Sequence, residues 1–417
     1  MKKYVIVGRK RLRGNIKIGG SKNAVLPILA ATVLIDGQSI IHNCPDISDT
    51  HTSIDILNYL GCKTAFANNT LIVDARGIDK TRLPSEHVEK MRSSIIFTGA
   101  LLSRFGEFSS VSPGGCRLGL RPIDLHLNAF EQLGANIFDD DKMICAKAEK
   151  LVGENICLNF PSVGATQNAM LAAVFAKGTT IITNAAREPE IVDLQSFLNA
   201  AGAKISGAGE PTILIDGVKK LNDVEYKIMP DRIVAGTYLV AGAITRGHVC
   251  VNNVNPKDLL PVTTALTKMG AKIVLGEKEI TIDMKGRPIA LPHLITAPHP
   301  EFPTDMQPQF AALMATASGT SSISENMFEA RDAHIPELIK MGANITNFGG
   351  SNFIIEGIAA LHGKDVCAKD LRGGAALVLA GLAAHGVTTV HNACYVKRGY
   401  ENIVQDLTLL GAGIKEI

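Results

Sequence analysis

The chain has 417 residues, of which 46% are hydrophobic and 20% charged, and this composition is typical of a well-packed soluble protein. Its formal net charge of +2 gives no reason to expect binding to nucleic acid or to a membrane surface. A chain of this length usually forms more than one hydrophobic core, so we expect two domains.

The spacing of cysteines and histidines disfavours disulfides and metal sites. The eight cysteines are scattered without a Cys-x-x-Cys pair, and the eleven histidines show no His-x-x-x-His spacing. The apolar run at the N-terminus covers only four residues, which is too short for a signal peptide. We therefore expect a cytoplasmic protein with reduced thiols, no bound metal and no cofactor.

Six strongly apolar segments are predicted to form buried helices, in chain order at 23–34, 93–102, 168–176, 233–244, 308–317 and 374–384. A Gly-led strand often follows, as at 178–184, and amphipathic helices such as 191–203 and 330–343 end in a glycine. The six glycines are Gly61, Gly134, Gly202, Gly270, Gly342 and Gly411, separated by 73, 68, 68, 72 and 69 residues. This near-constant period indicates one supersecondary unit used six times.

Each repeat has the pattern βαβαββ, which predicts an α/β fold. Because the apolar helices need cover on most faces, we expect sheets packed outside three central helices in each of two domains. The border falls after the third repeat, near residues 221–232. The absence of G-x-G-x-x-G and G-x-x-x-x-G-K-[ST] motifs disfavours the Rossmann and P-loop nucleotide folds.

Charged and polar side chains follow the register of the repeat. The starts of the buried helices carry Lys22, Asn23, Arg92, Thr166, Gln167, Arg232, Asp305 and Arg372, and the loops before the amphipathic helices carry Arg121, Lys257, Arg331 and Arg398. Any one of them is also explained as an ordinary surface charge at a helix end. As a set in register, they predict that helix N-termini converge on an interdomain cleft that binds phosphate and carboxylate groups.

The second repeat is longer than the others between its strand and its helix-ending glycine. This interval is 22 residues from Ser112 to Gly134, against 16 to 19 in the other five copies. The extra residues form a glycine-rich loop, bounded by two prolines, that is typical of a mobile lid. Cys116 lies on it beside Arg117 and near Arg121, and a thiol on an exposed cationic loop can have a lowered pKa and be reactive. A single cysteine is more often an inert core residue, but the three glycines and two arginines nearby disfavour burial.

Asp305 is an acid at a position where other repeats offer cations. It lies in the segment FPTDMQPQ, with a proline on either side. A carboxylate at a helix start is often only a cap. In a cleft that binds anions it is equally well placed to act as a general base.

The segments GGSKNA, PGGC, SVGAT, NAAREPEIVDL, FPTDMQPQ and RGYE occur in order along the whole chain. In these segments the sequence closely resembles the enolpyruvyl transferases of the UDP-N-acetylglucosamine 1-carboxyvinyltransferase family, which open bacterial peptidoglycan synthesis. The cysteine loop and FPTDMQPQ are the specific motifs. The resemblance implies a two-domain inside-out α/β barrel, with residues 22–229 as one domain, 1–21 with 230–417 as the other, and the active site between them.

The resemblance also implies a reaction. The enolpyruvyl group of phosphoenolpyruvate passes to the 3′-hydroxyl of UDP-N-acetylglucosamine by addition and elimination, and phosphate leaves. Cys116 matches the proton donor, which also forms a covalent adduct and is the target of the epoxide fosfomycin, and Asp305 matches the general base. The partners expected are these two small molecules, with no nucleic acid and no membrane.

The implied site residues fall into three groups. Phosphoenolpyruvate is expected to contact Lys22, Asn23, Arg121, Arg331, Arg372 and Arg398, of which Lys22 and Arg398 also count as catalytic. UDP-N-acetylglucosamine is expected to contact Asn23, Arg92, Arg121, Pro122, Ile123, Asp124, Leu125, Ser162, Val163, Gly164, Asp305 and Met327. Asp370 matches a carboxylate near the reacting centre.

The sequence departs from the family at Arg117, Ala330, Asp332 and Lys397, none of which is assigned to chemistry. Two other functions stay open. The first is the related transfer to shikimate 3-phosphate, which the cysteine loop and SVGAT disfavour. The second is a non-catalytic paralogue that binds UDP-sugar, which the intact set of Cys116, Asp305 and the cations disfavours.

Overall fold

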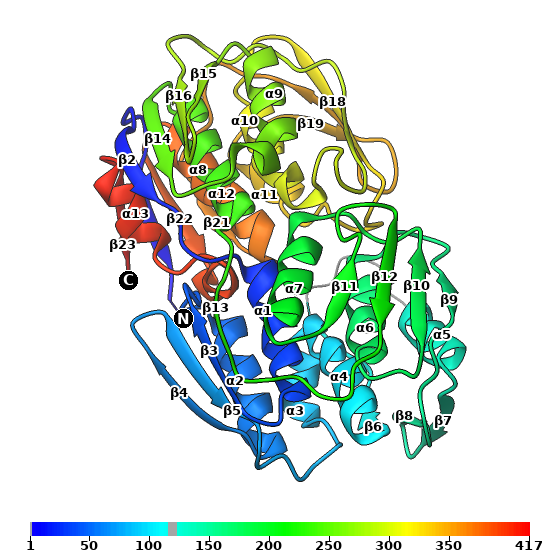
Figure 1. The fold of residues 1–417 in the computed structure, drawn as a ribbon. Coiled ribbons are helices and arrows are strands. Elements are labelled where there is room, and N and C mark those ends of the chain that lie inside the picture. Colours follow the sequence, from blue (N-terminus) through cyan, green and yellow to red (C-terminus); the bar gives the residue numbers. More distant parts are fainter. Residues whose placement is uncertain (1, 116–122) are drawn as a thin grey trace. The chain divides into compact units, whose positions relative to one another are not determined.

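The computed structural model describes residues 2–115 and 123–417. Contacts divide the chain into two compact units (Figure 1). Unit I holds residues 20–115 and 123–229, and unit II holds residues 2–19 and 230–417. Each unit has its own cluster of buried apolar side chains, so each has its own hydrophobic core.

Three apolar helices form the centre of unit II. They are α8 (Arg232–Ile244), α10 (Gln307–Met314) and α12 (Leu371–Ala383). Each contacts the other two, and every residue of α10 is buried. Helices with so few polar side chains are stable only when neighbours cover them on nearly all faces.

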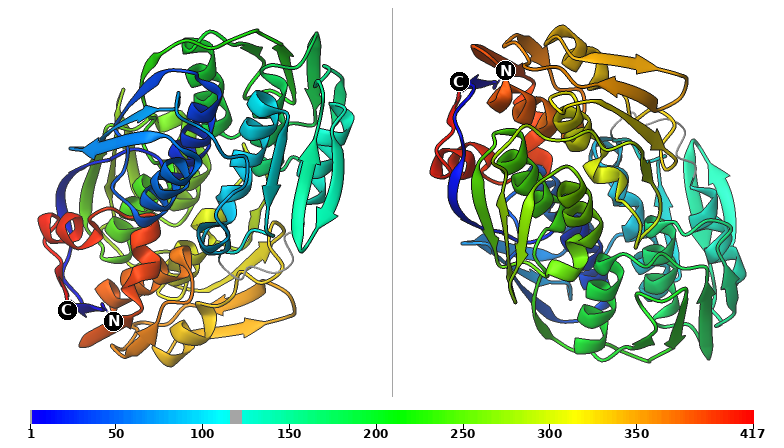
Figure 2. Two further views of the ribbon diagram at one scale, coloured as in Figure 1. Left: turned by 90° about the horizontal axis from the view of Figure 1, so that it is seen from below. Right: turned by 90° about the horizontal axis from the view of Figure 1, so that it is seen from above.

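The sheets of unit II provide this cover. Helix α8 packs on β14 and β16, α10 on β18 and β20, and α12 on β1 and β22 (Figure 2). In the part of unit II that the structure describes, the three sheets have the orders β21–β22–β1–β23, β15–β16–β14–β2 and β17–β18–β20–β19. The strands are β1 (Tyr4–Val7), β2 (Arg13–Lys17), β14 (His248–Asn252), β15 (Lys272–Leu275), β16 (Glu279–Asp283), β17 (Leu294–Thr296), β18 (Thr320–Glu325), β19 (Asn344–Asn347), β20 (Asn352–Glu356), β21 (Asp365–Cys367), β22 (Val387–His391) and β23 (Gly413–Glu416).

Unit I repeats this plan around α1 (Lys22–Ala31), α4 (Ile96–Phe105) and α6 (Val163–Ala173). Helix α4 contacts both others, and it approaches α6 closely at Gly99, where a Cβ would lie 2.5 Å from the backbone oxygen of Asn168. Among its described residues, the sheets have the orders β13–β3–β5–β4, β11–β12–β10–β9 and β6–β8–β7. The strands are β3 (Gln38–His42), β4 (Lys63–Ala67), β5 (Thr70–Asp74), β6 (Glu107–Ser110), β7 (Asn136–Asp140), β8 (Met143–Lys147), β9 (Asn155–Cys157), β10 (Thr179–Thr183), β11 (Lys204–Ser206), β12 (Thr212–Asp216) and β13 (Val224–Lys227).

The outer helices end where the repeat predicts. They are α2 (Ser48–Leu60), α5 (Asp124–Gln132) and α7 (Pro189–Ala200) in unit I, and α9 (Leu260–Lys268), α11 (Ile335–Lys340) and α13 (Ile403–Leu409) in unit II. A further short helix, α3 (Ser85–Lys90), precedes the 3₁₀ turn η2 (Arg92–Ile95). All six repeat glycines have left-handed φ angles between 94° and 110°, which confirms their role in helix termination.

The βαβαββ order recurs along the chain, but β13 pairs with β3 and β2 pairs with β14, so the first and fourth repeats exchange their first strands. Two other repeats also depart from the pattern. In the second repeat an isolated bridge between Arg82 and Ser109 stands in place of the first strand. In the sixth repeat the last strand is supplied by β1 from the N-terminal end, which pairs with β22 and β23. The predicted α/β architecture, with helices inside and sheets outside, is confirmed.

The observed helix bounds differ from the predicted ones by a few residues, and two helices differ most. The amphipathic helix expected at 330–343 is only α11, Ile335–Lys340, because Pro336 fixes the first turn and residues 331–334 before it are not helical, with a turn at 333–334. The apolar helix expected at 168–176 begins earlier, at Val163, where the side chain of Ser162 provides the cap.

Candidate active site

Asp305 binds two arginines through both of its carboxylate oxygens. It lies in the 3₁₀ turn η4 (Thr304–Met306), directly before α10. Its Oδ1 accepts a hydrogen bond from Arg331 Nη2 at 2.9 Å. Its Oδ2 accepts from Arg372 Nη2 at 2.8 Å and from Arg372 Nε at 3.2 Å. The fold thus brings together three predicted site residues that lie far apart in the sequence.

This pairing determines the charge on the cluster. Burial alone would raise the pKa of Asp305, but the charges of Arg372 and Arg331 and their hydrogen bonds hold it well below its usual range. The arginine side chains are only 4% and 5% exposed, so neither could lose the carboxylate without leaving a buried charge unpaired. Asp305 is therefore ionised at neutral pH and is a weak base while both arginines hold it.

Each arginine keeps one N–H group without a partner in the described part of the chain. These groups are Nε of Arg331 and Nη1 of Arg372, and both are buried. A buried donor without an acceptor is unfavourable by about 1–3 kcal/mol. The pair of spare donors suits an anion with several oxygens, such as a phosphate or a carboxylate.

Asp370 lies at the start of α12 beside this cluster. Its Oδ1 accepts a hydrogen bond from the Gly373 N–H at 2.8 Å and caps the helix. His334 is packed against the same turn, since a Cβ on Gly373 would lie 3.2 Å from the His334 Cβ. Burial lowers the pKa of His334 to about 4, with Arg331 acting in the same direction and Asp370 opposing it. The imidazole is therefore neutral at pH 7.

Arg398 ends the 3₁₀ helix η5 (Ala393–Arg398) and is half-buried. The neighbouring Lys397 donates a hydrogen bond from Nζ to Glu416 in β23 at 2.7 Å. Tyr400 follows two residues after Arg398, and the centre of its ring lies 5.9 Å from the guanidinium carbon of Arg372. The residue before the RGYE segment is therefore bound to β23, and Tyr400 within the segment lies near Arg372.

Lys22 is the first residue of α1 in unit I. Its Nζ forms an ion pair at 2.9 Å with Asp49 Oδ2, and the two side chains are 13% and 5% exposed. Asp49 lies in the first turn of α2. Asn23, the next residue of α1, is half-buried. This ion pair fixes the position of the Lys22 ammonium.

The start of α6 holds three more of the predicted residues. Ser162 caps the helix by accepting a hydrogen bond from the Ala165 N–H at 3.4 Å. Val163 and Gly164 follow, and a Cβ at Gly164 would lie 3.1 Å from Cε1 of His126. Elsewhere in unit I, Arg92 donates a hydrogen bond from Nη1 to the Pro113 carbonyl oxygen at 3.4 Å.

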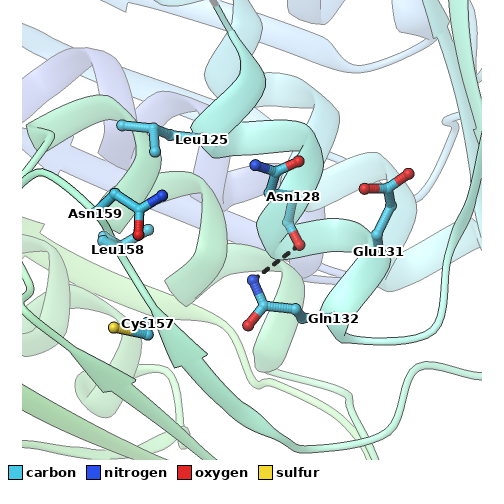
Figure 3. Close-up of a pocket in the computed structure, with 7 residues that line it drawn as sticks. All are labelled: Leu125, Asn128, Glu131, Gln132, Cys157, Leu158 and Asn159. Carbon is cyan, nitrogen blue, oxygen red and sulfur yellow. Dashed lines mark hydrogen bonds between the residues drawn. The ribbon is translucent and has the colours of Figure 1, made fainter.

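Cys116, Arg121 and Pro122 lie outside the described residues, as does most of the predicted lid. Ile123 precedes α5, Asp124 begins it and is exposed, and Leu125 lines a pocket of about 470 Å³ in unit I (Figure 3). The pocket is bounded by Leu125, Asn128, Glu131 and Gln132 of α5 and by Cys157, Leu158 and Asn159. Apart from Leu125, it contains none of the residues that the sequence assigns to chemistry.

Four residues around Asp305 and Lys22 were not predicted to belong to the site: Asp49, Thr304, Glu325 and His334. The repeat register could have identified Asp49, because it stands six residues after Asn43 just as Arg398 stands six residues after Asn392. The others have no such signal. Met327, which was predicted, donates its backbone N–H to Glu325 at 2.9 Å.

No group of three or more His, Cys, Asp and Glu side chains among residues 2–115 and 123–417 has the geometry to hold a metal ion. Within the same residues, no helix is long and apolar enough to cross a membrane.

The sequence and the fold place the chain in one class of enzyme. Residues 6–407 match the family model of EPSP synthase (3-phosphoshikimate 1-carboxyvinyltransferase), and the chain is a member of this enolpyruvyl transferase family. The crystal structure of the enolpyruvyl transferase NikO from Streptomyces tendae is 27% identical, with a TM-score of 0.89 over 100% of this chain and 98% of that one. EPSP synthase from Acinetobacter baumannii, at 18% identity and a TM-score of 0.76 over all of both chains, shares the two-domain inside-out fold.

Relatives with higher sequence identity are named for one particular reaction within this class of enzyme. UDP-N-acetylglucosamine 1-carboxyvinyltransferase 2 of Caldanaerobacter subterraneus is 47% identical over 417 residues, which is the full length of both chains. UDP-N-acetylglucosamine 1-carboxyvinyltransferase of Coxiella burnetii is 47% identical over 419 residues, covering all of this chain and 96% of that one. The chain is therefore a transferase of the enolpyruvyl transferase family.

Proposed function

We propose that the protein transfers the enolpyruvyl group of phosphoenolpyruvate to the 3′-hydroxyl of UDP-N-acetylglucosamine and releases phosphate. The observation that carries the proposal is the Asp305 carboxylate held between two buried arginines that each keep a spare N–H group. Full-length identity of 47% to transferases named for this reaction supports the choice of substrate.

The proposed reaction has two steps. In the first, the sugar oxygen bonds to C2 of phosphoenolpyruvate, the hydroxyl proton passes to a base, and a proton is added to the methylene carbon, C3. In the second, C3 loses a proton and the C–O bond to phosphate breaks, which restores the double bond. We assign the base to Asp305 and the proton donor for C3 to Cys116, because a hydroxyl and a methylene carbon each need a positioned partner.

The anionic groups of phosphoenolpyruvate need fixed cations. We assign this role to Lys22, Arg121, Arg331, Arg372 and Arg398, with Asn23 beside them. Arginine suits the task because its planar fork presents paired donors to phosphate and carboxylate oxygens. Cations held in place before the reaction also stabilise the negative charge that develops on the leaving phosphate.

Asp305 cannot act as an effective base while three hydrogen bonds from two arginines occupy it. A substrate anion that takes over donors from Arg331 or Arg372 would relieve this pairing and raise the pKa of Asp305. Under this proposal, binding of phosphoenolpyruvate both neutralises the arginines and makes the carboxylate basic enough to accept the hydroxyl proton.

We further propose that UDP-N-acetylglucosamine contacts Asn23, Arg92, Ile123–Leu125, the α6 start at Ser162–Gly164, Asp305 and Met327, with Arg121 and Pro122. Asp370 is assigned to the reacting centre. A cytoplasmic location is supported by the free thiols of Cys44, Cys62, Cys145, Cys157, Cys250, Cys367 and Cys394. In this setting the product would enter peptidoglycan synthesis.

A phosphate-release assay tests the proposal. Phosphoenolpyruvate should yield phosphate in the presence of UDP-N-acetylglucosamine and not in the presence of shikimate 3-phosphate. The reverse result would assign the protein to the shikimate branch of the family. Binding of UDP-N-acetylglucosamine without phosphate release from phosphoenolpyruvate in the presence of either acceptor would identify a non-catalytic paralogue.

A further inference from the structure

Arg331 is held by more than its pairing with Asp305. Its Nη1 donates a hydrogen bond to the hydroxyl oxygen of Thr304 at 2.8 Å, and its Nη2 donates to Asp305. The ring of Phe328 lies 4.7 Å from the guanidinium carbon. Because a guanidinium is planar, fixing both terminal nitrogens also fixes the direction of the remaining Nε–H.

The Thr304 hydroxyl is itself oriented by a buried carboxylate. It donates to Glu325 Oε2 at 2.8 Å, and Glu325 is 7% exposed. A carboxylate only accepts and a guanidinium only donates, so the chain can run in one direction alone, from Arg331 through Thr304 to Glu325. The hydroxyl hydrogen points to Glu325, and this leaves an oxygen lone pair directed at Arg331.

The other oxygen of Glu325 is anchored to the surrounding turn. Oε1 accepts hydrogen bonds from the Thr296 hydroxyl at 2.8 Å, from the Met327 N–H at 2.9 Å and from the Phe328 N–H at 3.3 Å. Glu325 therefore joins β17, the end of β18 and the η4 turn, and it ties the residue before Asp305 to the segment that carries Phe328. A carboxylate with this many donors has a fixed orientation.

We propose that Glu325, acting through the Thr304 hydroxyl, is a positioning residue that aims the unpaired Nε–H of Arg331 at the substrate anion. The inference rests on the proposed function, in which Arg331 binds phosphoenolpyruvate. Without the Thr304 hydroxyl, Arg331 keeps only Asp305 as a hydrogen-bonding anchor for its terminal nitrogens, so its plane can rotate and the Nε–H loses its fixed direction. The consequence is weaker binding of phosphoenolpyruvate.

The chain offers a matched control. Thr296 and Thr304 both donate a hydroxyl hydrogen bond of 2.8 Å to Glu325, one to each carboxylate oxygen, but only Thr304 accepts from Arg331. Thr304→Val should raise the KM for phosphoenolpyruvate about 10-fold to 100-fold, because the bond it removes has a charged donor. Its kcat and its KM for UDP-N-acetylglucosamine should change less than about threefold. Thr296→Val should leave all three parameters within about twofold of the wild type, although it removes a more deeply buried hydroxyl, which also accepts a hydrogen bond from the Asn326 N–H at 3.0 Å.

Steady-state kinetics with each substrate varied in turn would measure these values, and thermal unfolding would report the stability of each variant. Thr304→Ser restores the hydroxyl and should restore the KM for phosphoenolpyruvate. Glu325→Gln, which keeps the shape but removes the charge, should raise the same KM. An active wild type with equal effects of Thr304→Val and Thr296→Val would overturn the positioning role alone. A wild type that releases no phosphate would overturn the proposed function and the positioning role with it.

Discussion

Replacing Asp305 with asparagine tests the central cluster, because the change keeps the shape of the side chain and removes its charge. An amide oxygen can accept from one arginine, but the amide nitrogen is a donor and would face donors of the other arginine. At least one of the bonds from Arg331 or Arg372 is lost, and a hydrogen bond to a charged group contributes about 1.5–3 kcal/mol. Because the Asp305 side chain is 22% exposed, the loss should fall below the full cost of breaking a buried ion pair.

We therefore expect Asp305→Asn to lower the free energy of unfolding of unit II by about 2–4 kcal/mol at pH 7. For a unit of this size the change corresponds to a fall in Tm of about 5–15 °C. The substitution also removes the proposed base, and the loss in kcat should be at least about 100-fold. Differential scanning calorimetry and the phosphate-release assay measure the two effects.

The stability difference should depend on pH in one direction. The folded-state pKa of Asp305 lies well below its value in the unfolded chain, so the stabilisation is fully present above the unfolded pKa and is lost as the pH falls through the folded one. The gap between wild type and Asp305→Asn should thus be constant above about pH 5 and narrow in more acidic solution. A gap that is absent at pH 7, or one that grows on acidification, would refute the electrostatic account of the cluster.

Three further outcomes are expected. Asp49→Asn removes the charged partner of Lys22, so kcat/KM for phosphoenolpyruvate should fall about tenfold or more, and an unchanged value would show that the ion pair does not position the ammonium. Cys116→Ser should abolish the fosfomycin adduct that mass spectrometry detects on the wild type and reduce phosphate release; an adduct at another cysteine would contradict the role given to the loop thiol. Burial lowers the pKa of His334 from 6.5 to about 4, so the unfolded chain binds the proton more readily than the folded protein. Acidification from pH 7 to pH 5 should therefore remove about 2 kcal/mol of stability from the wild type, and His334→Gln should retain this stability. Equal losses of stability in both proteins would contradict this assignment.

The repeat made the fold predictable from the sequence, and it also placed the candidate residues at helix starts and loops. Lys22 and Arg232 begin their helices, Asp305 precedes α10, and Arg372 lies in the first turn of α12, as the register requires. The register could not indicate which of these side chains meet. The contact of Asp305 with Arg372 depends on how α10 and α12 pack, and a one-dimensional period contains no information about the distance between neighbouring copies.

Glu325, which supports the cluster around Asp305, could not be predicted from the sequence for a different reason. Glu325 ends a strand whose alternate residues face the core, and an acid there predicts nothing more than a strand end. Its function arises from four hydrogen bonds donated by three separate segments. Such a role depends on where donors converge in space. Buried carboxylates must satisfy several acceptor positions, and the donors that satisfy them rarely lie in the same local sequence.

The repeat explains why the cluster around Asp305 differs from the other helix starts. At the start of a helix the first backbone N–H groups have no partner within the helix, and together with the helix dipole they favour anions or capping side chains. Ser162 and Asp370 cap α6 and α12 in this way. The Asp305 carboxylate is instead paired with two cations, Arg331 from the loop of the same repeat and Arg372 from the helix start of the next. Competition for these two arginines is what allows one side chain to be an inert ion-pair partner without substrate and a base with it, under the function proposed here.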